Sequence, residues 1–237
     1  MNLLDIAALF VFALFILGGM YRGFLYNALS VGAYMVSWLL GILLMPLGSH
    51  AIKNSADLYS MMLYYTEGSE YVHDAELART TISSLSANRL NAIIEEANLP
   101  YPMGKAIARN IATEAFSDQS ITTLGDYFNQ TIVSVFINIL VFILLFLAIR
   151  GVLAFVINGV DYARTLPQLR SGDRLLGAGL GVVRGILALF LVFMLFPIVL
   201  TIMGMSDFSV ITDLVDGSLL SSFFYRSNFL LGMMPGI

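Results

Sequence analysis

Long apolar stretches dominate the pattern of hydrophobic and polar positions along this chain. Residues 131–149 contain no charged side chain, and similar stretches lie at residues 6–20, 23–47 and 185–203. Because a helix rises 1.5 Å per residue, about 20 apolar residues cross a hydrocarbon core of about 30 Å. The pattern therefore predicts an all-α, polytopic membrane protein with four transmembrane helices, the first beginning near residue 3.

The spacing of these stretches predicts how they are connected. Only Tyr21 and Arg22 separate the first two, which predicts a tight helical hairpin over residues 1–48. Residues 131–205 are expected to form a second hairpin with a connection at residues 150–184. Pro197 can kink the last segment of this hairpin, because proline removes a helical hydrogen bond.

The remaining parts of the chain show helical, amphipathic patterns. Residues 49–130 hold ten of the sixteen acidic residues, and apolar side chains recur at three- and four-residue steps over residues 76–94. This predicts one helix that ends before Pro100, and a second short helix at residues 103–116. The tail, residues 206–237, carries an apolar stripe from Phe208 to Phe223. Such stripes are typical of helices that lie on the bilayer or pack on the bundle.

Basic residues predict the orientation. One side of the membrane has two basic residues near it, Lys53 and Arg226, and the other has six arginines: Arg22, Arg150, Arg164, Arg170, Arg174 and Arg184. Positive charge is retained in the cytoplasm. Both short connections are therefore expected in the cytoplasm, while both termini and residues 49–130 are expected to be extracytoplasmic.

The composition mainly excludes certain classes of partner, site and activity. The chain is 58% hydrophobic and 12% charged, with a net charge of −4, so nothing indicates a nucleic-acid partner. It has no cysteine, which excludes disulfides and thiolate metal sites. His50 and His73 fit no metal-ligand spacing, and no catalytic motif appears. We therefore expect no enzyme activity, no cofactor and no metal. The first segment lacks a basic start and a cleavage site, which favours a retained helix over a signal peptide.

One motif occurs twice. Residues 19–25 and 181–187 both read Gly-x-x-Arg-Gly-apolar-Leu, and in the predicted orientation each copy opens an outward-going helix at the cytoplasmic face. Two interpretations remain open. The copies can mark a parallel structural repeat, which many transporters contain. Alternatively, the similarity arises by chance, because an arginine at the inner edge benefits any transmembrane helix.

Glycines recur every four residues before the last segment, at Gly177, Gly181 and Gly185. On a helix they line one face, where another backbone can approach closely, so we interpret them as a packing seam. The second segment offers a matching face of small residues: Ala33, Ser37 and Gly41. Residues 175–183 are too short to span, and we expect them to form a half-helix in the inner leaflet.

Asp5 is the only carboxylate within an apolar segment. It can lie among the lipid headgroups and favour the positive end of its own helix. Alternatively, it has a partner on another segment, or binds a proton or an ion, because intramembrane acids are often functional. Arg22 is excluded as its partner, because seventeen residues of straight helix separate the two by about 26 Å.

These residues resemble a known family. Leu4-Asp5-Ile6, the apolar run into Gly19-Met20-Tyr21-Arg22-Gly23-Phe24, and residues 173–185 are similar to the colicin V production protein family of bacteria. The resemblance covers all four apolar segments. It implies a protein of the bacterial cytoplasmic membrane that is linked to toxin production or export and to envelope homeostasis. The motif positions that match are Asp5, Arg22, Gly23, Asp173, Gly177, Gly181, Arg184 and Gly185, and the resemblance implies no chemical role for them.

Two functional hypotheses follow. The first is a non-enzymatic factor in toxin production, secretion or envelope homeostasis that contacts other membrane proteins or a second copy of itself. Sparse intramembrane charge favours this hypothesis, because a solute pathway usually needs polar groups at the midplane. The second is a small oligomeric channel or transporter, which the repeated motif and the glycine-rich element favour.

Overall fold

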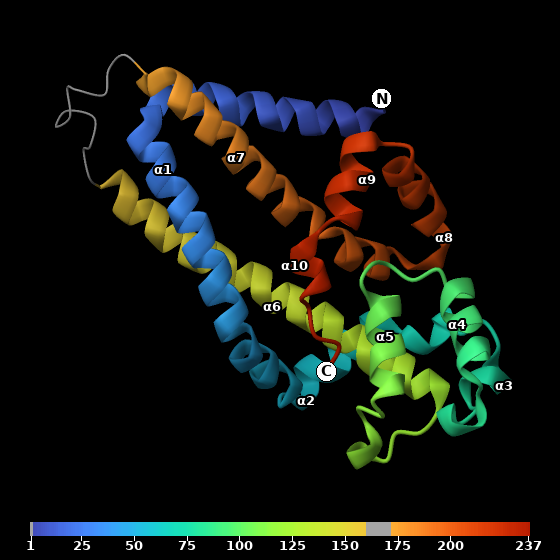
Figure 1. The fold of residues 1–237 in the computed structure, drawn as a ribbon. Helices are drawn as coiled ribbons and strands as arrows, with labels where there is room; N and C mark the ends of the chain where they lie inside the picture. Colours follow the sequence, from blue (N-terminus) through green and yellow to red (C-terminus); the bar gives the residue numbers. More distant parts are fainter. Residues whose placement is uncertain (1, 160–171) are drawn as a thin grey trace. The chain divides into compact units, whose positions relative to one another are not determined.

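The computed structural model describes residues 2–159 and 172–237, with backbone alone at residues 204–211. The described part of the chain is all-helical, as the sequence predicts (Figure 1). Its α-helices and 3-10 helices (η) are α1 Leu3–Lys53, α2 Ala56–Thr66, η1 Gly68–Tyr71, α3 Ala75–Ala78, η2 Ile82–Ser84, α4 Ala87–Glu96, α5 Met103–Ala112, η3 Ser117–Gln119, α6 Leu124–Asn158, α7 Asp173–Phe193, α8 Phe196–Asp216, α9 Leu219–Arg226 and α10 Phe229–Gly232.

Three helical stretches of the described chain are long and apolar enough to cross a membrane: Leu3–Lys53, Leu124–Asn158 and Asp173–Met203. The first has 51 residues, which corresponds to about 76 Å of helix, more than twice a hydrocarbon core. It is not straight, because Gly23 has φ 77° and ψ 178°. The helix therefore consists of a first arm (residues 3–22) and a second arm (residues 24–53). Tyr21 and Arg22, expected to connect two helices, are themselves helical.

The chain folds into two compact units. Unit 1 contains Met1–Met45, Phe142–Met194 and Val210–Asn228. Unit 2 contains Pro46–Val141, Leu195–Ser209 and Phe229–Ile237. Because α1 and α6 supply residues to both units, this grouping does not follow the linear division at residues 48, 130 and 205.

In unit 1 the first arm of α1 packs against α7 in antiparallel direction, and α9 lies near its N-terminal end (Figure 1). An aromatic cluster joins the three helices, because the Phe224 ring of α9 lies 6.0 Å from that of Phe12 and 5.1 Å from that of Phe190. The second arm packs on α6 instead, with the Tyr34 and Phe146 rings 5.7 Å apart. These contacts explain why the chain turns at Gly23: its two arms have different partners.

The helices around the predicted cytoplasmic connection are longer than expected. Helix α6 continues past Arg150 to Asn158, and α7 begins at Asp173, so that Arg184 lies inside a helix. The expected half-helix at residues 175–183 is wrong, because α7 is continuous through this stretch. The last apolar stretch is instead interrupted at residues 194–195, between α7 and α8. Helix α8 then starts with Pro197 in its first turn. Proline fits there because the first helical N–H groups have no intrahelical partner. Arg164 and Arg170 lie outside the described residues.

Unit 2 is built around the first half of α6. Its Tyr127, Phe128 and Ile132 are fully buried, as are Met103 and Ile107 of α5. Phe128 and Ile132 lie four residues apart, as do Met103 and Ile107, so each helix turns one apolar face toward the other elements of the unit.

The single amphipathic helix expected at residues 76–94 is wrong, because α3, η2 and α4 occupy this stretch. Asp74 accepts from two N–H groups at the start of α3, and the Ser86 hydroxyl accepts from Arg89 N–H at the start of α4. Between them, Ile82 N–H donates to Thr122 O at 2.9 Å. These local and sheet-like bonds compete with a continuous helix.

The tail does not form one amphipathic helix either. It contains the end of α8 and the short helices α9 and α10. Val215 is buried whereas Leu219 is exposed, so the expected stripe does not share one face. Phe208 and Ile211, which begin the stripe, belong to residues 204–211, of which the backbone alone is described.

Candidate functional site

The structure gathers most of the motif residues around the kink in α1, all within unit 1. The first copy of the motif ends at Gly23, where the kink lies, and the start of α7 with Asp173 and Gly177 packs against it. Arg184 approaches from farther along α7. Asp5 lies at the opposite end of the first arm. These positions allow the role of each motif residue to be examined from its contacts.

The glycines of α7 permit backbone contact with the first arm. A Cβ added at Gly181 would lie 2.5 Å from the Phe15 carbonyl oxygen, and one at Gly185 would lie 2.9 Å from the Phe12 ring. A Cβ at Gly177 would meet the Gly19 carbonyl oxygen and lie 3.0 Å from the Gly23 carbonyl carbon. A side chain therefore does not fit on this face unless the helices move apart.

The partner of this seam differs from the one expected. Ala33, Ser37 and Gly41 of the second arm were expected to pack against the α7 glycines, but a Cβ at Gly41 would meet the Phe142 ring of α6, 3.1 Å away. The physical reason is the kink, which directs the second arm toward α6. The first arm carries its own glycine at position 19, which allows the close approach to α7.

Asp173 fixes the kink. Phe24 N–H, the first of the second arm, donates to Asp173 Oδ1 at 2.7 Å. A carboxylate at a helix start satisfies a free N–H group and interacts favourably with the helix dipole. Gly23 lies very close to this carboxylate and has a positive φ. A side chain at this position would therefore be strained. The first residue of α7 thus caps the second arm.

Asn27 is a central residue of the site that the sequence analysis missed. Its side chain is fully buried. Its Nδ2 donates to the Gly19 and Gly23 carbonyls at 3.1 and 2.6 Å, and its Oδ1 accepts from Arg184 Nη1 at 2.7 Å. It therefore satisfies carbonyl groups beside the kink and connects them to α7. The signal available in the sequence for this role was a polar residue one turn after a glycine within an apolar stretch.

Three arginines surround the start of the second arm. Arg22 donates to the Tyr26 hydroxyl, and its guanidinium lies 4.5 Å from the centre of the Tyr26 ring. Arg184 also lies over this ring, at 5.8 Å. Arg150 donates to Ser30 Oγ at 2.7 Å. In contrast to the expectation that Arg150 and Arg184 mark helix ends, both are half-buried inside helices.

Asp5 is buried, with 1% of its surface exposed. Its Oδ1 accepts from Ser218 Oγ at 2.6 Å and from Leu220 N–H at 2.9 Å, at the start of α9. Asn2 N–H donates to Oδ2 at 3.1 Å. Of the two interpretations from sequence, these contacts match the one with a partner on another segment, and that partner is a helix N-terminus.

The two copies of the repeated motif differ in structure. Gly23 interrupts a helix, with φ 77°, whereas Gly185 lies within the regular helix α7. Arg22 contacts the neighbouring Tyr26, while Arg184 reaches Asn27 on another helix. The contacts therefore give no support to a parallel repeat built on this motif.

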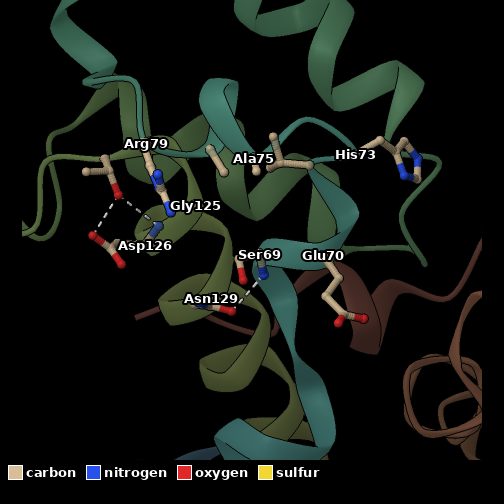
Figure 2. Close-up of a pocket in the computed structure, with 11 residues that line it drawn as sticks. Ser69, Glu70, His73, Ala75, Arg79, Gly125, Asp126 and Asn129 are labelled. Carbon is tan, nitrogen blue, oxygen red and sulfur yellow. Dashed lines mark hydrogen bonds between the residues drawn. The ribbon is translucent and has the colours of Figure 1, made fainter.

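Unit 2 contains a separate cavity of about 740 Å³ (Figure 2). Its wall is held by Asn129, which accepts from Ser69 N–H at 2.7 Å, and by Asp126, which accepts from Thr123 Oγ1 at 2.6 Å. The lining residues are Ser69, Glu70, Val72, His73, Ala75, Ala78, Arg79, Thr123, Gly125, Asp126 and Asn129. The cavity lining thus contains both negatively and positively charged side chains, and it is formed by residues of η1, α3 and α6 and of the segments beside them.

Tyr71 lies beside a smaller pocket of about 190 Å³ in the same unit, with Glu70 and Thr201. Burial raises the pKa of Tyr71, and the charge of Glu70 raises it further, while a hydrogen bond with Thr201 opposes the change. The phenol is therefore a neutral hydrogen-bonding group at physiological pH.

Comparison with known proteins gives a match to a protein family. The family model described as Colicin V production protein matches residues 113–228. No curated protein and no solved structure matches the chain. The matched stretch includes the α7 positions of the motif, from Asp173 to Gly185, and excludes Asp5, Arg22 and Gly23, which precede it. The resemblance found from the sequence is confirmed over this stretch.

Proposed function

On the premise that this chain is a colicin V production family member, which the match over residues 113–228 supports, we propose that it is a multi-pass protein of the bacterial cytoplasmic membrane. It acts as a non-enzymatic factor in toxin production or export, or in envelope homeostasis. It does so by contacting protein partners, either other membrane proteins or a second copy of itself.

The cavity of unit 2 carries this proposal. It is lined by charged and neutral polar groups and opens between short helical elements and the N-terminal end of α6 (Figure 2). Glu70, His73 and Arg79 add an acceptor, an imidazole ring and a donor to the lining. A surface of this kind suits a polar segment of a protein better than a lipid tail.

We further propose four membrane crossings, with both termini and residues 49–130 outside the cytoplasm. The kink at Gly23 supports this number, because it divides a helix of 51 residues into arms of about 30 and 45 Å. The excess of arginine near the two short connections supports the orientation. In this topology the cavity of unit 2 faces the compartment in which envelope and export partners are found.

Site-specific cross-linking in cells tests the partner role. A photoreactive side chain at Ala78, in the cavity wall, is expected to give discrete protein adducts, whereas the same group at exposed Glu96 of α4 is expected to give none. Equal labelling at both positions, or at neither, would refute a partner at the cavity. In intact spheroplasts, a cysteine at exposed Glu95 should react with an impermeant thiol reagent. Reaction only after membrane disruption would place this segment inside.

The alternative function is a small oligomeric channel or transporter. A buried polar strip in unit 2 favours it, since Ser49 Oγ donates to Asn138 Oδ1 at 2.5 Å and Lys53 Nζ donates to Ser134 Oγ at 3.1 Å. Polar side chains within spanning helices are typical of solute pathways. Flux into liposomes containing the purified protein, abolished by Lys53→Met, would favour this alternative over the partner role.

A further inference from the structure

We infer that Arg22, Arg150 and Arg184 (the arginine cluster) form a binding site for a phosphate group, supplied by a lipid headgroup or by a soluble phosphate compound. The three side chains come from three helical segments of unit 1: the first arm of α1, α6 and α7. The site goes beyond the proposed partner role, which uses the cavity of unit 2.

The second arm of α1 contacts all three guanidinium groups. Tyr26, Ser30 and Tyr34 lie at four-residue steps and so share one face of this arm. Arg22 and Arg184 lie over the Tyr26 ring, at 4.5 and 5.8 Å from its centre. Arg150 donates to Ser30 and lies 4.7 Å from the centre of the Tyr34 ring. An aromatic face orients a guanidinium and leaves the donors on its edge available for a second partner.

None of the three arginines forms an ion pair within the described part of the chain, and the neighbouring Asp173 carboxylate accepts from Phe24 N–H instead. The hydrogen-bond partners of the three arginines there are neutral: the Tyr26 hydroxyl, the Asn27 amide and the Ser30 hydroxyl. Arg22 and Arg184 lie over the same Tyr26 ring, so their positive charges are close to each other. Like charges on helices of low polarity repel strongly, because little water screens them. A bound anion would turn this repulsion into attraction.

Several donors of the cluster are also unused. Nε and Nη1 of Arg150 and Nε of Arg184 are shielded from solvent and have no hydrogen-bond partner in the described residues. Such buried charged donors are unfavourable unless an acceptor satisfies them. Phosphate has several acceptor oxygens and matches the guanidinium fork in bidentate geometry. Phosphate has more acceptor oxygens than a carboxylate, which has two, and can therefore engage more than one guanidinium group.

The cluster is also accessible. Arg22 is exposed, whereas Arg150 and Arg184 are half-buried, so a ligand can first contact Arg22, and contact with the shielded donors of Arg150 and Arg184 requires these side chains to shift. The first arm beside it exposes apolar side chains, among them Leu17 and Met20. Apolar surface of this kind contacts acyl chains in a bilayer, which makes a lipid headgroup one source of the phosphate.

Binding to the purified full-length protein tests the site. Native mass spectrometry would measure retained phosphatidylglycerol, with diacylglycerol as the phosphate-free comparison, and thermal unfolding would measure the effect of inorganic phosphate. The variants are Arg150→Gln and Arg184→Gln. Arg89→Gln is the matched control, because Arg89 is exposed on α4 in unit 2 and the charge change is the same.

We expect the wild type and Arg89→Gln to bind one of the two phosphate probes, and each cluster variant to bind it about tenfold more weakly or worse. Retention of phosphatidylglycerol without an effect of inorganic phosphate assigns the site to a lipid headgroup. Stabilisation by inorganic phosphate assigns it to a soluble compound. If the two variants do not fold, the exposed Arg22→Gln decides by the same criterion. Failure of the wild type to bind either probe, or equal weakening by Arg89→Gln, would overturn the site.

Discussion

The glycine seam between α7 and the first arm makes a sharp prediction about a single methyl group. In Gly181→Ala the added Cβ would lie 2.5 Å from the Phe15 carbonyl oxygen and 3.1 Å from Ile16 Cα. Both neighbours are backbone atoms of a helix, so the helices themselves have to separate. Gly179 provides the matched control, because it lies on the same helix and a Cβ there has no neighbour within 4 Å.

The magnitude follows from two opposing effects. Replacing glycine by alanine inside a helix stabilises it by about 1 kcal/mol, and this gain applies equally to both variants. Forcing an extra methyl group into a packed interface costs about 1–3 kcal/mol, and this cost applies only at Gly181. The free energies of unfolding of the two variants should therefore differ by about 1–3 kcal/mol. For a chain of this size that is a difference of roughly 2–12 °C in Tm.

Thermal unfolding of both purified variants in the same detergent measures this difference. We expect Gly179→Ala to unfold at or above the temperature of the wild type, and Gly181→Ala to unfold clearly below Gly179→Ala. Gly181→Leu should be worse, with a lower yield of folded protein and of any oligomer. If Gly181→Ala and Gly179→Ala unfold at the same temperature, the seam does not hold the two helices in contact and the packing argument fails.

Three further predictions concern single polar groups. Asn27→Leu removes three hydrogen bonds, including that from Arg184, and should lower the free energy of unfolding by roughly 2–4 kcal/mol in denaturant titrations. Asp173→Ala removes the cap of Phe24 and should cost about 1 kcal/mol more than Asp173→Asn, which keeps an acceptor oxygen. Because the pKa of Tyr71 is raised in the folded state, the contribution of this group to stability is present below pH 10.0 and is lost as the pH rises above it. Tyr71→Phe should therefore show a smaller fall in stability at alkaline pH.

Each of these predictions has a distinct failing result. An Asn27→Leu protein as stable as the wild type would mean that the kink does not need its amide. Equal effects of alanine and asparagine at position 173 would mean that Phe24 does not depend on a side-chain acceptor. A wild type and a Tyr71→Phe variant with the same stability profile between pH 9 and about 11 would show that this phenol does not titrate with unfolding.

The sequence predicted those features that depend on local periodicity. Apolar stretches identified the long helices, and the four-residue spacing of Gly177, Gly181 and Gly185 indicated a face for close packing. Both signals are local because helix geometry maps sequence spacing directly onto faces and lengths. The sequence also singled out Asp5 and Asp173, whose carboxylates both contact the start of another helix.

The features that were missed depend on contacts between distant parts of the chain. The seam was assigned to the second arm instead of the first, because periodicity reveals a face without revealing its partner. The helix expected at residues 76–94 is divided because Ile82 pairs with Thr122, forty residues away. Asn27 was not singled out because its role depends on the kink at Gly23 and on the hydrogen bond from Arg184 of α7.

The two capping carboxylates have a consequence for synthesis of the protein. Asp5 binds the start of α9 across 213 positions of sequence, and Asp173 binds the second arm across 149. At about 5–20 residues per second, the ribosome needs about 10–40 s between making Asp5 and making Ser218. During that time the contact of Asp5 with α9 does not exist, whereas the contact of Asp173 with Phe24 needs only the first 173 residues and can form earlier. A nascent chain that stops before residue 218 therefore keeps Asp5 without its α9 partners, which distinguishes it from the finished protein.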